Sequence, residues 1–247
     1  MSGHNKWSTI KRKKGATDAK RSKIFSRIIK EITVAVKEGG PDPDGNPRLR
    51  LAIANAKGAS MPKDNITRAI NKGSDKDSAN YQETSYEGYA PNGIAIFIDC
   101  TTDNLQRTIS NVRSYFNKFG GSLGTNGSLA FLFDRKGVFT IPKGNINMDE
   151  LEMELIDAGA EDIQLEDDMI TVTTAMEDFG PMLKKLEEMK IETENAELQR
   201  IPKNTVKVDQ ETARKVMKLI DHFEDDDDVT NVYHNMELTD EMMEEME

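Results

Sequence analysis

The order of predicted elements between Gly137 and Arg200 restricts the fold of this chain more than any other feature. Runs of β-branched and apolar residues alternate there with apolar residues at helical spacing. They predict strands at 137–141, 162–166, 169–174 and 191–200, with helices at 149–158 and 178–189. The order β-α-β-β-α-β is that of a ferredoxin-like unit, so we predict one complete unit within the chain.

The segments on either side of this unit predict a second, interrupted one. Before it lie a strand at 94–100, a helix at 104–118 and the strand LAFLFD, and after it a strand at 205–208, a helix at 210–223 and a strand at 229–236. Together these pieces can form a second ferredoxin-like unit into which the first is inserted. The junction LAFLFDRKGVFTI is predicted as one bent strand or a hairpin, and 74–93 as a linker or irregular edge.

The first 73 residues have the pattern of a small helical bundle. A helix is expected from near Thr17 to Gly39, where Gly39, Gly40 and Pro41 stop it. Asn46 then caps a second helix with Pro47 at its first position, and a third helix ends at Gly73.

The predicted fold class is therefore α+β multidomain, with an N-terminal three-helix domain followed by two ferredoxin-like α/β domains, one inserted into the other. The predicted boundaries are 1–78 for the basic helical domain, 79–134 plus 203–240 for the discontinuous α/β domain, 135–202 for the inserted domain and 241–247 for an acidic tail.

Charge is separated strongly along the chain. Residues 1–73 hold 17 Lys and Arg but only 6 Asp and Glu, a net charge of +11, although the whole chain carries −11. The remainder therefore carries −22. Such asymmetry predicts that the N-terminal part binds a polyanion.

The basic residues of this part are the candidate nucleic-acid-binding site, because Lys and Arg neutralise phosphates and release counterions. Trp7 adds a π-face on which a base or guanidinium can stack. A solvated tail without a partner is the alternative. The candidate residues are Lys6, Trp7, Lys11, Arg12, Lys13, Lys14, Lys20, Arg21, Lys23, Arg27, Lys30, Arg48, Arg50, Lys57, Lys63 and Arg68.

Other motifs give weaker signals. The loop FGGSLGTNGS matches neither the dinucleotide nor the P-loop pattern, and it precedes a strand instead of a helix. A flexible connection is therefore the simpler interpretation, and its role stays open. RKGVFTI faintly resembles an RNA-binding strand motif, but core packing explains Phe131 and Phe133 more simply.

The sequence shows no pattern typical of an enzyme. His4, His222 and His234 do not have the spacing of a metal site, and the acidic run 224–228 lacks the glycine and spacing of a calcium loop. Cys100 at a strand end is expected to be a buried, inert thiol. We predict no enzyme activity, no catalytic residue, no metal and no cofactor.

No apolar run is long enough for a membrane helix, so no membrane partner is expected. The basic start lacks the apolar segment of a secretory signal, and one cysteine suits a reducing compartment, so a cytoplasmic location is predicted. The acidic α/β domains are candidates for contacts with protein partners. The sequence leaves the oligomeric state open.

Four segments carry a resemblance to a known family. They are GHNKWSTIKRKKGATDAKRSKIFSRIIKEI, GGPDPDGNPRLRLAIANAKGASMPKDNITRAI, YEGYAPNGIAIFIDCTTDNLQRT and LAFLFDRKGVF. Together they resemble the YebC/PmpR family across nearly the whole chain. They are also similar to the mitochondrial translational activator of a cytochrome oxidase subunit. Asn71 stands where the family pattern leads us to expect a lysine.

The resemblance implies a three-domain protein that contacts nucleic acid through the segment containing Lys6, Trp7 and residues 11–14. It implies a transcriptional regulator that binds DNA, while some family members are linked to translation at ribosomes stalled on proline-rich stretches. We predict a non-enzymatic nucleic-acid-binding regulator of gene expression, with DNA as its target. A ribosome- or rRNA-associated translation factor is the alternative, and a metabolite-binding or enzymatic module ranks last because only the Gly-rich loop and fold analogy favour it.

Overall fold

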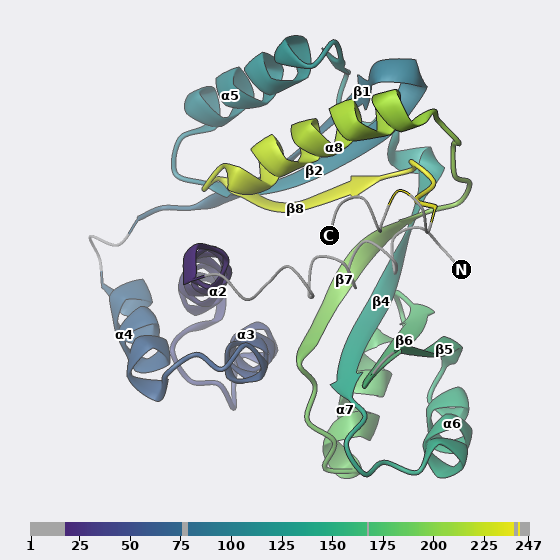
Figure 1. Cartoon of the computed structure of the whole chain (residues 1–247). Helices are drawn as coiled ribbons and strands as arrows, with labels where there is room; N and C mark the ends of the chain where they lie inside the picture. Colours follow the sequence, from purple (N-terminus) through teal and green to yellow (C-terminus); the bar gives the residue numbers. More distant parts are fainter. Residues whose placement is uncertain (1–17, 76–78, 167, 240–241, 243–247) are drawn as a thin grey trace. The chain divides into compact units, whose positions relative to one another are not determined.

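The computed structural model describes residues 18–75, 79–166, 168–239 and 242 (Figure 1). The described residues form two compact units. The first unit contains those of 1–27, 79–134 and 201–247, and the second contains those of 28–78 and 135–200. Each unit is built around its own four-stranded sheet.

The sheet of the first unit has the strand order β3-β1-β2-β8. β1 (Gln82–Ala90) and β2 (Ile94–Thr102) form an antiparallel hairpin through the short turn η2 (Pro91–Gly93), and β8 (Val229–His234) pairs with the other edge of β2. β3 is the two-residue strand Ser122–Leu123 beside β1. α5 (Leu105–Lys118) and α8 (Gln210–Asp225) cover one face of this sheet (Figure 1).

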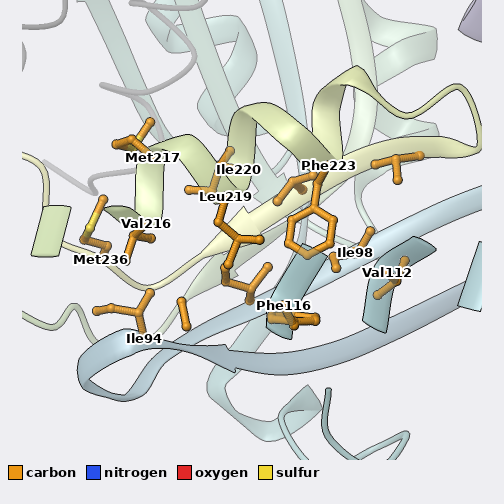
Figure 2. Packing of buried hydrophobic residues seen from close by; sticks show 14 of the residues in the cluster. Ile94, Ile98, Val112, Phe116, Val216, Met217, Leu219, Ile220, Phe223 and Met236 are labelled. Carbon is orange, nitrogen blue, oxygen red and sulfur yellow. The ribbon is translucent and has the colours of Figure 1, made fainter. Parts of the chain in front are cut away.

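Alternation along β2 explains why both faces of this sheet are buried. Ile94 and Ile98 lie on the side of the helices, in one core with Phe116 of α5 and Phe223 of α8 (Figure 2). Ile96 is buried in the same core. The rings of Phe116 and Phe223 meet edge to face, with centroids 5.0 Å apart.

On the opposite face of the same sheet, Ala95 and Phe97 pack against Leu129 and Phe133. These two residues flank the single-turn helix η3 (Ala130–Leu132). A strand that is buried on both faces needs a continuous apolar run, which is what IAIFI supplies.

The sheet of the second unit has the order β5-β6-β4-β7. The elements follow the chain as β4 (Phe133–Pro142), α6 (Met148–Asp157), β5 (Ala160–Glu166), β6 (Met169–Ala175), α7 (Phe179–Glu188) and β7 (Asn195–Pro202). Its core includes Phe139, Ile141, Leu155, Val172 and Leu186. This sequence of elements, with its strand order, is a ferredoxin-like arrangement and confirms the prediction for this part.

Three helices precede the sheets: α2 (Asp18–Gly39), α3 (Pro47–Gly58) and α4 (Lys63–Ser74). Asn46 caps α3 as expected, since its Oδ1 accepts from Leu49 N at 3.0 Å. Its buried Nδ2 also donates to the carbonyl groups of Ala35 and Gly40 near the end of α2. One side chain therefore fixes the turn between two helices. The predicted α+β class with a helical N-terminal part is confirmed.

Within the second unit, α3 packs against the edge strand β7. Asn55 Nδ2 donates to Ala196 O and Asn55 Oδ1 accepts from Ala196 N, both at 2.9 Å. The side-chain amide of Asn55 thus makes the same two hydrogen bonds to Ala196 that a peptide group of a neighbouring strand would make. At Gly58 the backbones approach so closely that an added Cβ would lie 2.1 Å from Glu194 O.

Three expectations need correction. Residues 82–90, expected within a linker or irregular edge, form the nine-residue strand β1. Asn92 and Gly93 both have positive φ, and an Asn-Gly pair is a typical signal of a hairpin turn that the linker prediction did not take into account. The strand expected at 205–208 is reduced to one bridge between Val206 and Met236. The junction, predicted as one bent strand or a hairpin, is also different: the single turn η3 replaces the start of the predicted strand, and β4 begins only at Phe133.

The exact domain boundaries stay a prediction. No helix in the described residues is long and apolar enough to cross a membrane.

Candidate nucleic-acid interface

The most basic segment of the candidate site lies outside the described residues. This applies to Lys6, Trp7 and Lys11, and equally to Arg12, Lys13 and Lys14. Lys20 belongs to α2, but its side chain is also outside the described part. The geometry below therefore concerns the cations of α2, α3 and α4 from Arg21 onward.

The beginning of α2 contacts an acidic turn of its own unit. Lys23 forms an ion pair with Asp225, and Arg27 Nη2 donates to Glu224 O at 2.9 Å. Arg21 is exposed and lies over the ring of Phe25, 5.5 Å from its centroid. Two predicted nucleic-acid-binding cations thus already have acidic or carbonyl partners inside the protein.

The acidic turn 224–228 is anchored by α5. Asp226 accepts hydrogen bonds from Asn111 Nδ2 at 2.9 Å and from the Tyr115 hydroxyl at 3.1 Å. Burial, together with the charge of Asp226, raises the pKa of Tyr115 to about 12. The phenol therefore stays a neutral donor to the carboxylate at physiological pH.

Asp228 is the buried end of the same turn. Arg107 binds it through two hydrogen bonds of 3.0 and 2.7 Å, and the Thr108 hydroxyl donates to it at 2.9 Å. Hydrogen bonds to Asp228 and then to Asp103 raise the pKa of Arg107 above its ordinary value. The acidic turn therefore connects α5 to the start of β8 through these hydrogen bonds.

Among the residues that the structure describes, no group of three His, Cys, Asp or Glu side chains is placed to hold a metal.

The cations of α3 and α4 belong to the second unit, and only some of them are exposed and so accessible to a phosphate. Arg48 binds Glu31 at 2.8 and 3.1 Å and Glu38 at 2.8 Å, so it ties α3 to α2. Four other predicted residues are exposed: Arg50, Lys57, Lys63 and Arg68. Lys30 is partly buried on α2. Lys72, in the last turn of α4, is an exposed cation that the sequence analysis did not include.

The Gly-rich loop is held by a buried carboxylate that no sequence pattern indicates. Glu87 on β1 is 2% exposed, and its carboxylate accepts hydrogen bonds from Gly127 N at 2.7 Å and from Leu129 N. Gly127 has φ +85°, a conformation that favours glycine. These two hydrogen bonds hold the loop against β1, and Gly127 allows the backbone conformation that the loop needs. No phosphate-binding pattern appears in it.

Two aromatic candidates separate in the structure. Phe133 is buried and meets Phe97 edge to face at 6.1 Å, whereas Phe131 is 66% exposed on η3. Core packing, expected for both residues, is therefore correct for Phe133 and wrong for Phe131. Because Phe131 lies in η3 and Phe133 begins β4, the two rings do not form a platform for stacked bases. Cys100 is buried, as expected for an inert thiol.

The described geometry defines a class of protein: a multidomain α+β protein with a cation-rich helical part and separate acidic sheet parts. Residues 5–76 match the TACO1/YebC protein N-terminal domain, and residues 81–236 match the TACO1/YebC second and third domain. The chain belongs to the TACO1/YebC family.

Relatives and a solved structure agree with this assignment. A probable transcriptional regulatory protein of Amoebophilus asiaticus is 54% identical over 96% of this chain and 98% of its own length. One of the same name from Chlorobaculum parvum is 51% identical over 100% of this chain and 99% of its own. The crystal structure of a conserved hypothetical protein from Aquifex aeolicus superposes with a TM-score of 0.81 at 43% identity, covering 90% of this chain and 93% of that one.

Proposed function

We propose that the protein is a non-enzymatic regulator of gene expression that docks on the phosphate backbone of DNA through its basic N-terminal domain. The observation that carries the proposal is the charge separation, +11 in residues 1–73 against −22 in the remainder. The relatives named probable transcriptional regulatory proteins support a regulatory role.

The mechanism is electrostatic. Each phosphate neutralised by Lys or Arg releases counterions, so affinity falls with salt at a slope of about 0.9 per contact on duplex DNA. The exposed Arg50, Lys57, Lys63 and Arg68 add to the basic segment around residues 11–14. In this proposal the acidic α/β parts do not bind the DNA duplex, and their acidic surfaces contact cationic proteins.

The test is duplex DNA binding as a function of salt, using the full chain and two variants with equal charge change. Changing Lys11, Arg12, Lys13 and Lys14 to Ala is expected to weaken binding about 100-fold at 50 mM salt, because several phosphate contacts are lost. The control changes four exposed lysines elsewhere, Lys184, Lys207, Lys215 and Lys218, to Ala. A wild-type log K that does not vary with salt, or equal losses for both variants, contradicts the proposal.

An rRNA-associated role in translation is the second candidate. It is favoured because the exposed Lys57, Lys63 and Arg68 suit contacts to phosphates, which carry no base sequence. The amide beside Arg68 is already in use, since Asn65 Oδ1 accepts a hydrogen bond from Arg68 at 2.9 Å. Backbone recognition of this kind suits structured RNA as well as DNA. Ribosome co-sedimentation with the same two variants separates the roles.

Neutralising the acidic turn should strengthen nucleic-acid binding. The Lys23–Asp225 pair is solvent-exposed, with 74% of the Asp225 side chain accessible, so it contributes at most about 1 kcal/mol to stability. Asp225→Asn is therefore expected to leave folding intact, free Lys23 and tighten duplex binding about twofold at low salt. Glu188→Gln, which removes an equally negative exposed side chain next to Lys184, is the control. Unchanged affinity in Asp225→Asn, measured by fluorescence anisotropy, would show that Lys23 does not contact the nucleic acid.

A further inference from the structure

The outer face of α5 differs in charge from the acidic unit to which it belongs. No Asp or Glu occurs between Asp103 and Asp134, although residues 74–247 contain 38 of them. α5 lies within this acid-free segment and presents one side of its surface to solvent, while Val112 and Phe116 face the core (Figure 2).

The exposed side chains on this face are polar hydrogen-bond donors, and none is acidic. Gln106, Ser110, Arg113 and Asn117 recur at steps of four, three and four, so they form one stripe along the helix. A shallow, open depression on this face is lined by Ser110, Arg113, Ser114, Asn117 and Lys118. Every one of these side chains can donate a hydrogen bond.

The two cations of this depression are not neutralised by carboxylates. Arg113 has no ion pair or hydrogen bond among the residues that the structure describes. Lys118 Nζ lies 3.0 Å from His222 Nε2, and the other ring nitrogen of His222 lies 2.9 Å from Lys218 O. This arrangement makes Nδ1 the protonated nitrogen and Nε2 an acceptor, so His222 holds the Lys118 ammonium in place without cancelling its charge.

We propose that this α5 surface, defined by Gln106, Ser110, Arg113, Ser114, Asn117 and Lys118, binds a strand of single-stranded RNA. It is a second contact, separate from the basic N-terminal domain. The proposal rests on nucleic-acid binding as the protein's general activity, but it does not depend on DNA being the target.

Charge density decides between a single strand and a duplex. A helix of 14 residues is about 21 Å long, and a DNA duplex of that length carries about 12 negative charges. Within the described part of the chain, Arg113 and Lys118 have no carboxylate partner, and Asp103 lies near one end of the helix. Two such cations match the few negative charges of a single strand and not the high charge of a duplex. Hydroxyl and amide side chains both donate and accept, which suits the 2′-hydroxyl that distinguishes RNA from DNA.

The experiment measures binding of fluorescein-labelled 20-nucleotide oligouridine to the full chain by anisotropy at 50 mM salt. Arg113→Glu is expected to weaken binding about tenfold, and Arg113→Ala is expected to lower the salt slope by about 0.7, the value for one contact on a single strand. Lys184→Glu is the matched control. It makes the same charge change at an exposed residue, which is 79% accessible on α7, and it should alter binding less than twofold.

The outcomes separate this proposal from the proposed function. Equal effects of Arg113→Glu and Lys184→Glu, or equal losses on oligouridine and oligothymidine, overturn the assignment of α5 to RNA, whatever the N-terminal variants do on duplex DNA. If the full chain binds neither oligouridine nor duplex DNA, both proposals fall. Unchanged thermal unfolding of Arg113→Glu shows that a loss of binding does not come from misfolding.

Discussion

Replacing Arg107 by Ala is expected to lower the free energy of unfolding of the first unit by about 3 kcal/mol. Arg107 is the cationic partner of Asp228, whose side chain is only 4% exposed. Removing the guanidinium takes two hydrogen bonds and the compensating positive charge away from this buried carboxylate, to which the Thr108 hydroxyl still donates. Losing one partner of a buried ion pair costs about 3 to 5 kcal/mol, and we take the lower end because Arg107 itself is half exposed.

Urea denaturation followed by circular dichroism checks this value, and hydrogen exchange of the α5 amides locates the loss. Arg113→Ala on the same helix is the control and should change stability by less than about 0.5 kcal/mol, since Arg113 is exposed. Arg107→Lys should fall between the two, because lysine restores the charge but not the paired hydrogen bonds. Equal stabilities for Arg107→Ala and Arg113→Ala would show that Asp228 finds other partners.

Gly58→Ala is expected to destabilise the second unit by about 3 kcal/mol. The added methyl group would lie 2.1 Å from Glu194 O and 2.7 Å from its carbonyl carbon, both of which are backbone atoms. A backbone cannot rotate away as a side chain can, so α3 must move off β7. That movement would also break the two hydrogen bonds between Asn55 and Ala196.

The matched control is Gly45→Ala in the turn before α3. There the nearest atom to an added Cβ is 3.8 Å away, an ordinary contact distance. We expect Gly45→Ala to leave the melting temperature nearly unchanged and Gly58→Ala to lower it by more than 5 °C. A Gly58→Ala melting temperature equal to that of Gly45→Ala would mean that α3 does not need this close approach.

Local signals made much of the fold predictable. The ferredoxin-like part follows from periodicity, because its helices and strands each have one clearly apolar face. The Asn46 cap follows from Asn-Pro at a helix start. β1 was missed because QETSYEGYA has few β-branched residues and gains its stability from pairing with β2, a partner that local pattern does not reveal.

The functional side chains were less predictable, for a physical reason. A cation in sequence does not show whether it will find a carboxylate in the fold. Lys23 and Arg48 find one, whereas Lys57 and Lys63 stay exposed. The bond between Arg107 and Asp228 joins residues 121 positions apart, and no spacing rule connects them. The absence of acid from 104–133 was visible in the sequence, but only the structure shows which residues of α5 reach solvent.

The pairing of Asn55 with β7 has a consequence for the addition of strands from other chains. β7 is an edge strand, and an edge with free backbone groups is a template on which another chain can add a strand. The amide of Asn55 occupies such a position by imitating a peptide group. α3 therefore covers part of the β7 edge and blocks strand addition there. A chain shortened to begin after α4 would expose these backbone groups of β7, and another chain could add a strand to them.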